Sequence, residues 1–174
     1  MRIISLLLVL ITFNLSSQEI KRVDSEKSFI NYTGKHFLHK WSAENKNISG
    51  LIQIDGESIS NIGIVAKVQD FKSGNSSLDS NSYRVLDALR IPNIVFRSSE
   101  IIDSLDVIKI SGTISFHGIE KDLNVLLDKS TENNTISLAG KFIINLSDFN
   151  VKRPSLLLQK IDNEIEIQIN LIFN

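Results

Sequence analysis

Residues 136–146 read Ile136-Ser137-Leu138-Ala139-Gly140-Lys141-Phe142-Ile143-Ile144-Asn145-Leu146. Apolar or small side chains occupy every second position of this stretch, and the positions between them are mostly polar. A period of two places the apolar row on one face of a β-strand and the polar row on the other. The stretch therefore predicts a half-buried strand of an antiparallel sheet.

The same alternation recurs on both sides of this segment. Turn-forming pairs such as Asp55-Gly56 and His117-Gly118 separate several of the repeats. Together they predict eight strands, at residues 28–37, 47–55, 61–69, 93–102, 108–117, 121–127, 136–146 and 164–173.

Helical patterns are rare between these strands. Residues 80–90 have apolar side chains at a spacing of three, with Asp79 as a candidate cap and Pro92 as a stop signal. Residues 156–161, after Pro154, predict a weaker helical turn. We therefore expect an all-β domain with a short helical insert.

Eight strands with one apolar face each must bury that face. A sheet closed into a barrel and two stacked sheets are the available solutions. The inward row includes four small residues near strand centres, and these either permit the coiling of a closed sheet or leave space for an apolar guest. They are Gly50, Ala66, Gly112 and Gly140.

The first 17 residues have the parts of a secretory signal. Arg2 precedes an apolar run of about a dozen residues, and small residues follow at Ser16 and Ser17. Such a run is short for a membrane span, which needs about 20 apolar residues. We expect residues 1–17 to be a cleaved signal peptide and residues 18–174 to form one exported domain without a membrane segment, periplasmic or secreted in a bacterial envelope.

Composition narrows the function of that domain. The chain has no cysteine, so it has neither disulfides nor a thiol nucleophile. Residues 18–174 carry 18 Lys and Arg against 20 Asp and Glu, because Arg2 is the one charge in the first 17 residues. This balance argues against nucleic-acid binding, which needs a basic face.

Signals for chemistry are weak. His36, His39 and His117 are the only imidazoles, and a spacing of three puts His36 and His39 on opposite faces if they share one strand. The sequence lacks a Gly-x-Ser-x-Gly elbow, a Ser-x-x-Lys pair and a glycine-rich phosphate loop. We expect no catalytic residue, no metal site and no cofactor.

Several segments together resemble the YceI-like, polyisoprenoid-binding family of exported bacterial proteins. The most telling is Ile91-Pro92, which ends the helical pattern and precedes a Phe96-containing strand. The resemblance covers nearly all of residues 18–174, through residues 28–32, 48–50, 71–74, 86–98, 110–113, 116–121 and 142–149.

This resemblance implies a lipocalin-like barrel of eight antiparallel strands, whose lumen holds an isoprenoid chain such as a quinone or polyprenyl phosphate. The helical insert would cover or line part of the barrel. Lys35 or His36 would lie near the polar end of the lipid. The expected lumen contacts are Tyr32, Ile52, Ile64, Leu86, Phe96, Ile114, Phe116, Phe142, Ile144 and Ile167.

Two other functions remain open from the sequence. One is an interaction or adhesion module whose barrel is filled by its own side chains, and the other is a hydrolase that uses His117 and an outward-facing serine. The volume of the lumen separates the carrier from the module. The sequence also leaves open whether the barrel forms a homodimer.

Overall fold

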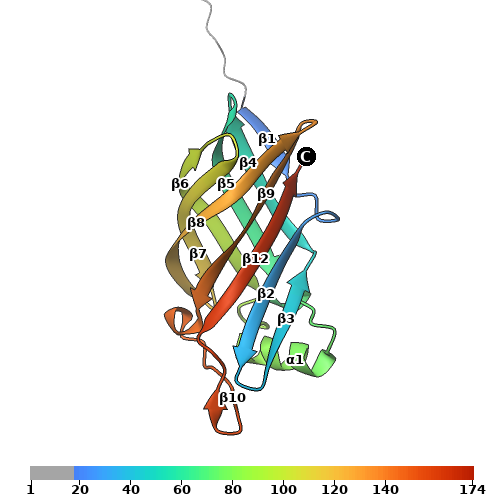
Figure 1. Ribbon diagram of the computed structural model, residues 1–174, viewed down its shortest axis with the longest axis vertical. Helices are drawn as coiled ribbons and strands as arrows, with labels where there is room; N and C mark the ends of the chain where they lie inside the picture. The colour runs from blue at the N-terminus through green and yellow to red at the C-terminus, as the bar shows by residue number, and fades with distance from the viewer. Residues whose placement is uncertain (1–17) are drawn as a thin grey trace, which may run out of the picture.

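Ten strands form one antiparallel sheet that curls into a barrel-like shape in the computed structural model, which describes residues 18–174 (Figure 1). The order across the sheet is β1-β4-β5-β6-β7-β8-β9-β12-β2-β3. The strands are β1 (Gln18–Arg22), β2 (Phe29–His36), β3 (His39–Asn45), β4 (Ile48–Asp55), β5 (Ser58–Lys67), β6 (Asn93–Asp103), β7 (Val107–Phe116), β8 (Ile119–Glu132), β9 (Thr135–Asn145) and β12 (Glu164–Phe173).

The expected fold is confirmed, and each of the eight predicted strands is present. The structure adds β1 and β3 to the sheet. Neither of them has a run of alternating apolar residues in its sequence. β1 lies at one edge of the sheet and β3 at the other. The predicted signal peptide, residues 1–17, lies outside the described residues.

Backbone hydrogen bonds join the β1 edge of the curled sheet to β12 and the β3 edge to a loop. Val23 N donates to Gly50 O (3.0 Å) and Asp24 N donates to Ile172 O (2.8 Å), so the segment after β1 joins β4 to β12. On β3, Glu44 and Lys72 exchange two bonds of 3.0 and 2.9 Å. These bonds satisfy edge groups that would otherwise be left unpaired.

The α-helix, α1 (Ser76–Val85), begins and ends earlier than predicted. Its cap is Asn75, whose side chain accepts from the backbone N–H groups of Ser77 and Leu78, so the expectation for Asp79 was wrong. The Asp79 carboxylate instead accepts from Ser73 Oγ at 2.6 Å. Short 3₁₀ helices, η1 (Val68–Asp70) and η2 (Leu146–Phe149), follow β5 and β9. No helix within residues 18–174 is long and apolar enough to cross a membrane.

The predicted helical turn at residues 156–161 is also wrong. The segment forms a β-hairpin of β10 (Ser155–Leu156) and β11 (Gln159–Lys160). Leu157 and Leu158 form its two-residue turn with φ values of 51° and 68°. Leucines are rare in this conformation, so the turn chemistry of the sequence gave no indication of a hairpin.

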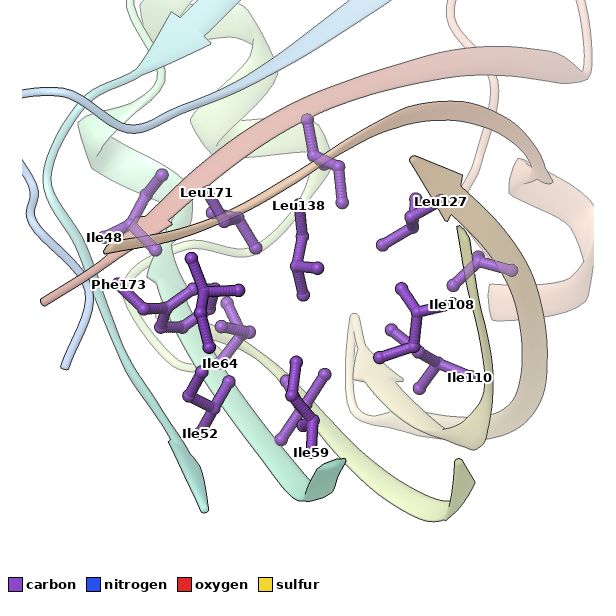
Figure 2. Close-up of a cluster of buried hydrophobic side chains, with 14 of the residues drawn as sticks. Ile48, Ile52, Ile59, Ile64, Ile108, Ile110, Leu127, Leu138, Leu171 and Phe173 are labelled. Atoms are coloured by element: carbon purple, nitrogen blue, oxygen red, sulfur yellow. The ribbon is translucent and has the colours of Figure 1, made fainter. Parts of the chain in front are cut away.

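The two ends of the barrel differ. The upper end in Figure 1 carries the β4–β5, β6–β7 and β8–β9 turns, and the lower end carries α1, the β2–β3 turn and the β10–β11 hairpin. Apolar side chains fill the upper part, where Ile52, Ile108 and Phe173 are fully buried (Figure 2). The upper end is therefore a packed core.

The inward glycines permit close packing. A Cβ atom at Gly112 would lie 2.3 Å from Arg97 O and 2.7 Å from the Phe96 ring. At Gly140 it would lie 2.6 Å from a methyl group of Leu127. These glycines thus allow neighbouring groups to approach the backbone, whereas Ala66 lines open space.

Candidate functional site

A cavity of about 420 Å³ occupies the lower part of the barrel. Its inner limit includes Ile110, Leu127 and Leu138, which also belong to the packed core in Figure 2. Because the upper barrel is filled, the hollow is a blind pocket that extends toward the lower end. Its size lies within the range of about 300–1,000 Å³ typical of small-molecule sites.

Nine of the ten residues expected in the lumen line this cavity. They come from six strands and from the end of α1. Along each of these strands every second side chain faces inward, so each strand contributes to the wall. The nine residues are Tyr32, Ile64, Leu86, Phe96, Ile114, Phe116, Phe142, Ile144 and Ile167.

Ile52 is the exception. It is fully buried in the upper core and does not line the cavity. Ile52 pairs with Ile62 in the β4–β5 ladder, and only Ile62 reaches the cavity wall. Facing inward therefore does not by itself bring a side chain to the hollow.

Polar groups in the cavity lie mainly at its lower end. The Tyr32 hydroxyl lies 3.5 Å from Ser82 Oγ of α1, and Asn81 contributes a second polar side chain to the lining. Burial raises the pKa of the Tyr32 phenol, and the contact with Ser82 offsets part of the rise. The phenol is therefore neutral at ordinary pH and is available for hydrogen bonding.

His36 is the most unusual polar residue of the lining. The residue is only 6% exposed, and its Nε2 lies 3.3 Å from Gln159 O. A carbonyl oxygen only accepts, so Nε2 carries the proton in the neutral ring and Nδ1 is an acceptor. Nδ1 is buried without a partner among residues 18–174. An unpaired buried polar atom is the position where a ligand group gains most from a hydrogen bond.

The other residues near this end are arranged differently from the sequence prediction. The chain turns at Phe37-Leu38, so His36 and His39 face each other across a hairpin with ring centroids 6.0 Å apart. They do not lie on opposite faces of one strand. Lys35 is exposed and is not part of the lining, whereas His39 and Trp41 are.

Chemistry beyond binding finds little support in the described part of the chain. Within residues 18–174 no three His, Asp or Glu side chains converge as metal ligands. His117 lies in the β7–β8 turn, with Nδ1 2.9 Å from Phe149 O, and it does not line the cavity. No hydrogen bond joins His117 to a serine among those residues.

Sequence reasoning missed part of the lower rim. The missed residues belong to the first turns of α1 and to the segment around β10, where the expected elements were displaced or of the wrong type. The Asn75 cap was the signal for the earlier start of α1. The missed lining residues are Leu78, Asn81, Ser82, Pro154, Ser155 and Ile161.

Comparison with known proteins agrees with the fold. The family model of the YceI-like domain matches residues 22–173. The chain belongs to the YceI-like family. No curated protein sequence matches this YceI-like domain.

Solved structures share its fold at low identity. BcnA of Burkholderia cenocepacia is 20% identical with a TM-score of 0.78, and the match covers 86% of this chain and 98% of BcnA. A polyisoprenoid-binding domain from Saccharophagus degradans is 12% identical with a TM-score of 0.74, covering 88% and 97%. A YceI protein of Campylobacter jejuni is 16% identical with a TM-score of 0.59, covering 72% and 81%. These similarities establish the fold of the YceI-like domain.

Proposed function

We propose that this YceI-like domain is an exported, non-enzymatic binding protein that holds an apolar lipid of the isoprenoid class in its cavity. The observation that carries the proposal is a blind cavity of about 420 Å³ lined mostly by Ile, Leu, Val and Phe. Export through residues 1–17 is part of the same proposal. The polyisoprenoid-binding domain among the structural neighbours supports this class of ligand.

The physical chemistry of the lining favours a flexible hydrocarbon. Each methylene moved from water into the cavity contributes about 0.8 kcal/mol, so several isoprene units supply a large driving force. An eight-residue strand spans about 26 Å, and the cavity occupies the part of that length below the packed core. A rigid polar metabolite would leave its polar groups unpaired against these walls.

The polar end of the lipid would lie at the lower end of the cavity. His36 Nδ1 is an acceptor without a partner among the described residues, so it suits the hydroxyl of an isoprenoid alcohol. When the ring is protonated, the same atom donates and suits a phosphate. Lys35, exposed on the adjacent position of β2, adds a cation for an anionic head group.

The alternative of an interaction module needs a barrel filled by its own side chains. Close packing without a share in the cavity wall is found in the upper part, around Ile52 and Phe173. A large apolar hollow costs stability in an empty protein, because its lining loses packing contacts. The cavity therefore favours a carrier over a packed module.

Phe142→Trp tests the proposal directly. Phe142 lines the cavity, and a larger ring there displaces ligand. If the larger ring keeps two methylenes of the ligand out of the cavity, the binding free energy becomes less favourable by about 1.6 kcal/mol. We therefore expect at least about tenfold weaker binding of a fluorescent isoprenoid alcohol.

The matched control is Ile143→Trp on the next residue, which is 57% exposed on the outer face of β9. It should bind as the parent does. If Phe142→Trp stays folded and binds isoprenoid as tightly as Ile143→Trp, the cavity is not the binding site.

A further inference from the structure

Two hairpin tips at the lower end of the barrel expose large apolar side chains to solvent. Phe37 and Leu38, in the β2–β3 turn, are 59% and 54% exposed. Leu157 is 70% exposed and Leu158 is fully exposed in the β10–β11 turn, which projects beyond the barrel in Figure 1. We name these four residues the tip face. Exposed apolar groups gathered in this way are typical of interaction sites.

The two hairpins lie side by side. Asp162 N donates to Lys35 O at 2.9 Å, and His36 Nε2 lies 3.3 Å from Gln159 O. These contacts join β2 to the strand and loop that follow the second tip. His36 is also part of the cavity lining, so the tip face borders the lower end of the cavity.

The second tip is strained in a way that packing does not explain. Leu157 and Leu158 have φ values of 51° and 68° in a two-residue turn, where Asn-Gly is the usual choice. A bulky residue at positive φ is a conformational outlier, and such strain concentrates at functional positions. Both side chains point into solvent, so contacts within the described chain do not offset the strain.

Positive charge surrounds the tip face. Residues 35–40 and 151–161 contain five Lys and Arg and no Asp or Glu, while the rest of the chain carries 14 Lys and Arg against 20 Asp and Glu. No described ion pair uses any of the five. Acidic Asp148 and Asp162 flank the second segment. The five cations are Lys35, Lys40, Lys152, Arg153 and Lys160.

The opposite end of the barrel provides an internal comparison. Leu105 is 90% exposed there, in the β6–β7 turn, but it is followed directly by Asp106, while the side chain of the nearby Asp103 is buried and paired with Lys129. The neighbouring β4–β5 turn adds Asp55 and Glu57. Among the hairpin turns of residues 18–174, exposed leucine is thus combined with positive charge at the cavity end and with acidic residues at the opposite end.

We propose that the tip face docks on a lipid bilayer rich in anionic head groups. The four apolar side chains would enter the boundary between head groups and acyl chains, and the cations would face the phosphates. Charge complementarity singles out this occupant, because an anionic bilayer offers both hydrocarbon and negative charge. Docking places the lower end of the cavity against the membrane. This inference concerns the protein surface and does not need the cavity ligand to be isoprenoid.

Co-sedimentation with vesicles tests the inference on the chain of residues 18–174. We expect binding to vesicles of phosphatidylglycerol and phosphatidylethanolamine, and much weaker binding to phosphatidylcholine alone. The double variant Leu157→Asn, Leu158→Gly carries the residues that the turn prefers, so it should unfold at equal or higher urea concentration than the parent. It should nevertheless bind the anionic vesicles about a hundredfold more weakly, since two leucine side chains no longer leave water.

Two further variants separate the contributions of charge and apolarity. Lys160→Gln should weaken binding to the anionic vesicles about fivefold and leave binding to phosphatidylcholine unchanged. Leu105→Ser, which removes an equally exposed leucine from the acidic end, should bind as the parent does.

The inference is overturned if the parent does not sediment with anionic vesicles, or if Leu105→Ser loses as much binding as the tip double variant. It is also overturned if the tips mediate self-association without vesicle binding, as analytical ultracentrifugation would show. Binding of an isoprenoid alcohol in the absence of vesicles is measured on the same variants. The tip variants should keep that binding, so failure of membrane docking is distinguishable from failure of the cavity assignment.

Discussion

His36 combines two properties that rarely occur together in one residue. It is buried, and one of its ring nitrogens has no partner within residues 18–174. A buried polar atom without a hydrogen bond costs about 1–3 kcal/mol, and in the empty protein this cost offsets what the bond from His36 to Gln159 O contributes. The residue is therefore suited to a state in which ligand supplies the missing hydrogen bond.

His36→Leu should separate stability from binding. We expect the free energy of unfolding of the empty protein to stay within about 1 kcal/mol of the parent, because the lost bond to Gln159 O offsets the removal of the unpaired nitrogen. Affinity for an isoprenoid alcohol should fall by up to about tenfold, as expected for one hydrogen bond.

The control ligand is the hydrocarbon of the same length without a hydroxyl, whose affinity should be unchanged. Calorimetric titration measures both. Equal loss of affinity for the alcohol and the hydrocarbon would contradict the role of His36 as a head-group acceptor.

Tyr32 carries a pH dependence that can be measured separately. Burial raises the pKa of its phenol above the ordinary value of 10.0. A group whose pKa is raised on folding contributes stability that is fully present below pH 10.0 and is lost as the pH rises through the folded-state pKa. Subtracting the tyrosinate absorbance of Tyr32→Phe from that of the parent isolates the signal of Tyr32. In the folded protein the midpoint of this difference should lie above pH 10.0. In denaturant it should titrate near 10.0, and coinciding midpoints would contradict the burial of this phenol.

At the level of single strands, glycine determines how closely neighbours approach. Gly112→Ala forces a methyl group onto Arg97 O and the Phe96 ring, and overpacking of this kind costs about 1–3 kcal/mol. Gly63→Ala is the matched control, because a Cβ atom at Gly63 on β5 meets nothing within 4 Å. Urea unfolding should give a lower midpoint for Gly112→Ala and an unchanged or higher midpoint for Gly63→Ala. Equal midpoints would contradict this prediction, because they would mean that β7 and its neighbours move to accommodate the added methyl group.

Elements with a run of alternating apolar residues could be predicted from the sequence, and elements without one could not. The period of two located eight strands because each has a row of residues that must leave water. β3 reads His-Lys-Trp-Ser-Ala-Glu-Asn, and its inward row of Trp41, Ala43 and Asn45 is too short and too mixed in polarity to stand out, although it pairs with β2 over seven residues. The β10–β11 hairpin was missed because Leu157 and Leu158 occupy turn positions that other residues usually fill.

Alternation of apolar residues also decided how much of the candidate site could be predicted. Inward-facing residues such as Phe96, Phe142 and Ile167 could be identified from the alternation alone, and they line the cavity. Ile52 has the same pattern and lies in the packed end. The depth to which a barrel is filled depends on the curvature of the whole sheet and on the sizes of facing side chains, and neither quantity is local in the sequence.

On the scale of the whole molecule, packing and charge both differ between the two ends. The upper end is packed and bears acidic turns, including Asp55, Glu57 and Asp106. The lower end holds the cavity, and the segments that carry the tip face contain five cations and no acid. Because the two ends differ in this way, an apolar ligand is expected to enter and leave through the lower end.

The central claim is that the cavity carries an isoprenoid lipid. The most direct measurement is native mass spectrometry of the full chain expressed in a bacterial host and purified from the envelope without detergent, followed by identification of the extracted lipid. The same masses report whether residues 1–17 have been removed. We predict a stoichiometric isoprenoid, such as a quinone or polyprenyl species, on the parent protein and its loss in Phe142→Trp. A parent protein that is empty after purification and also refuses added isoprenoids would contradict the account.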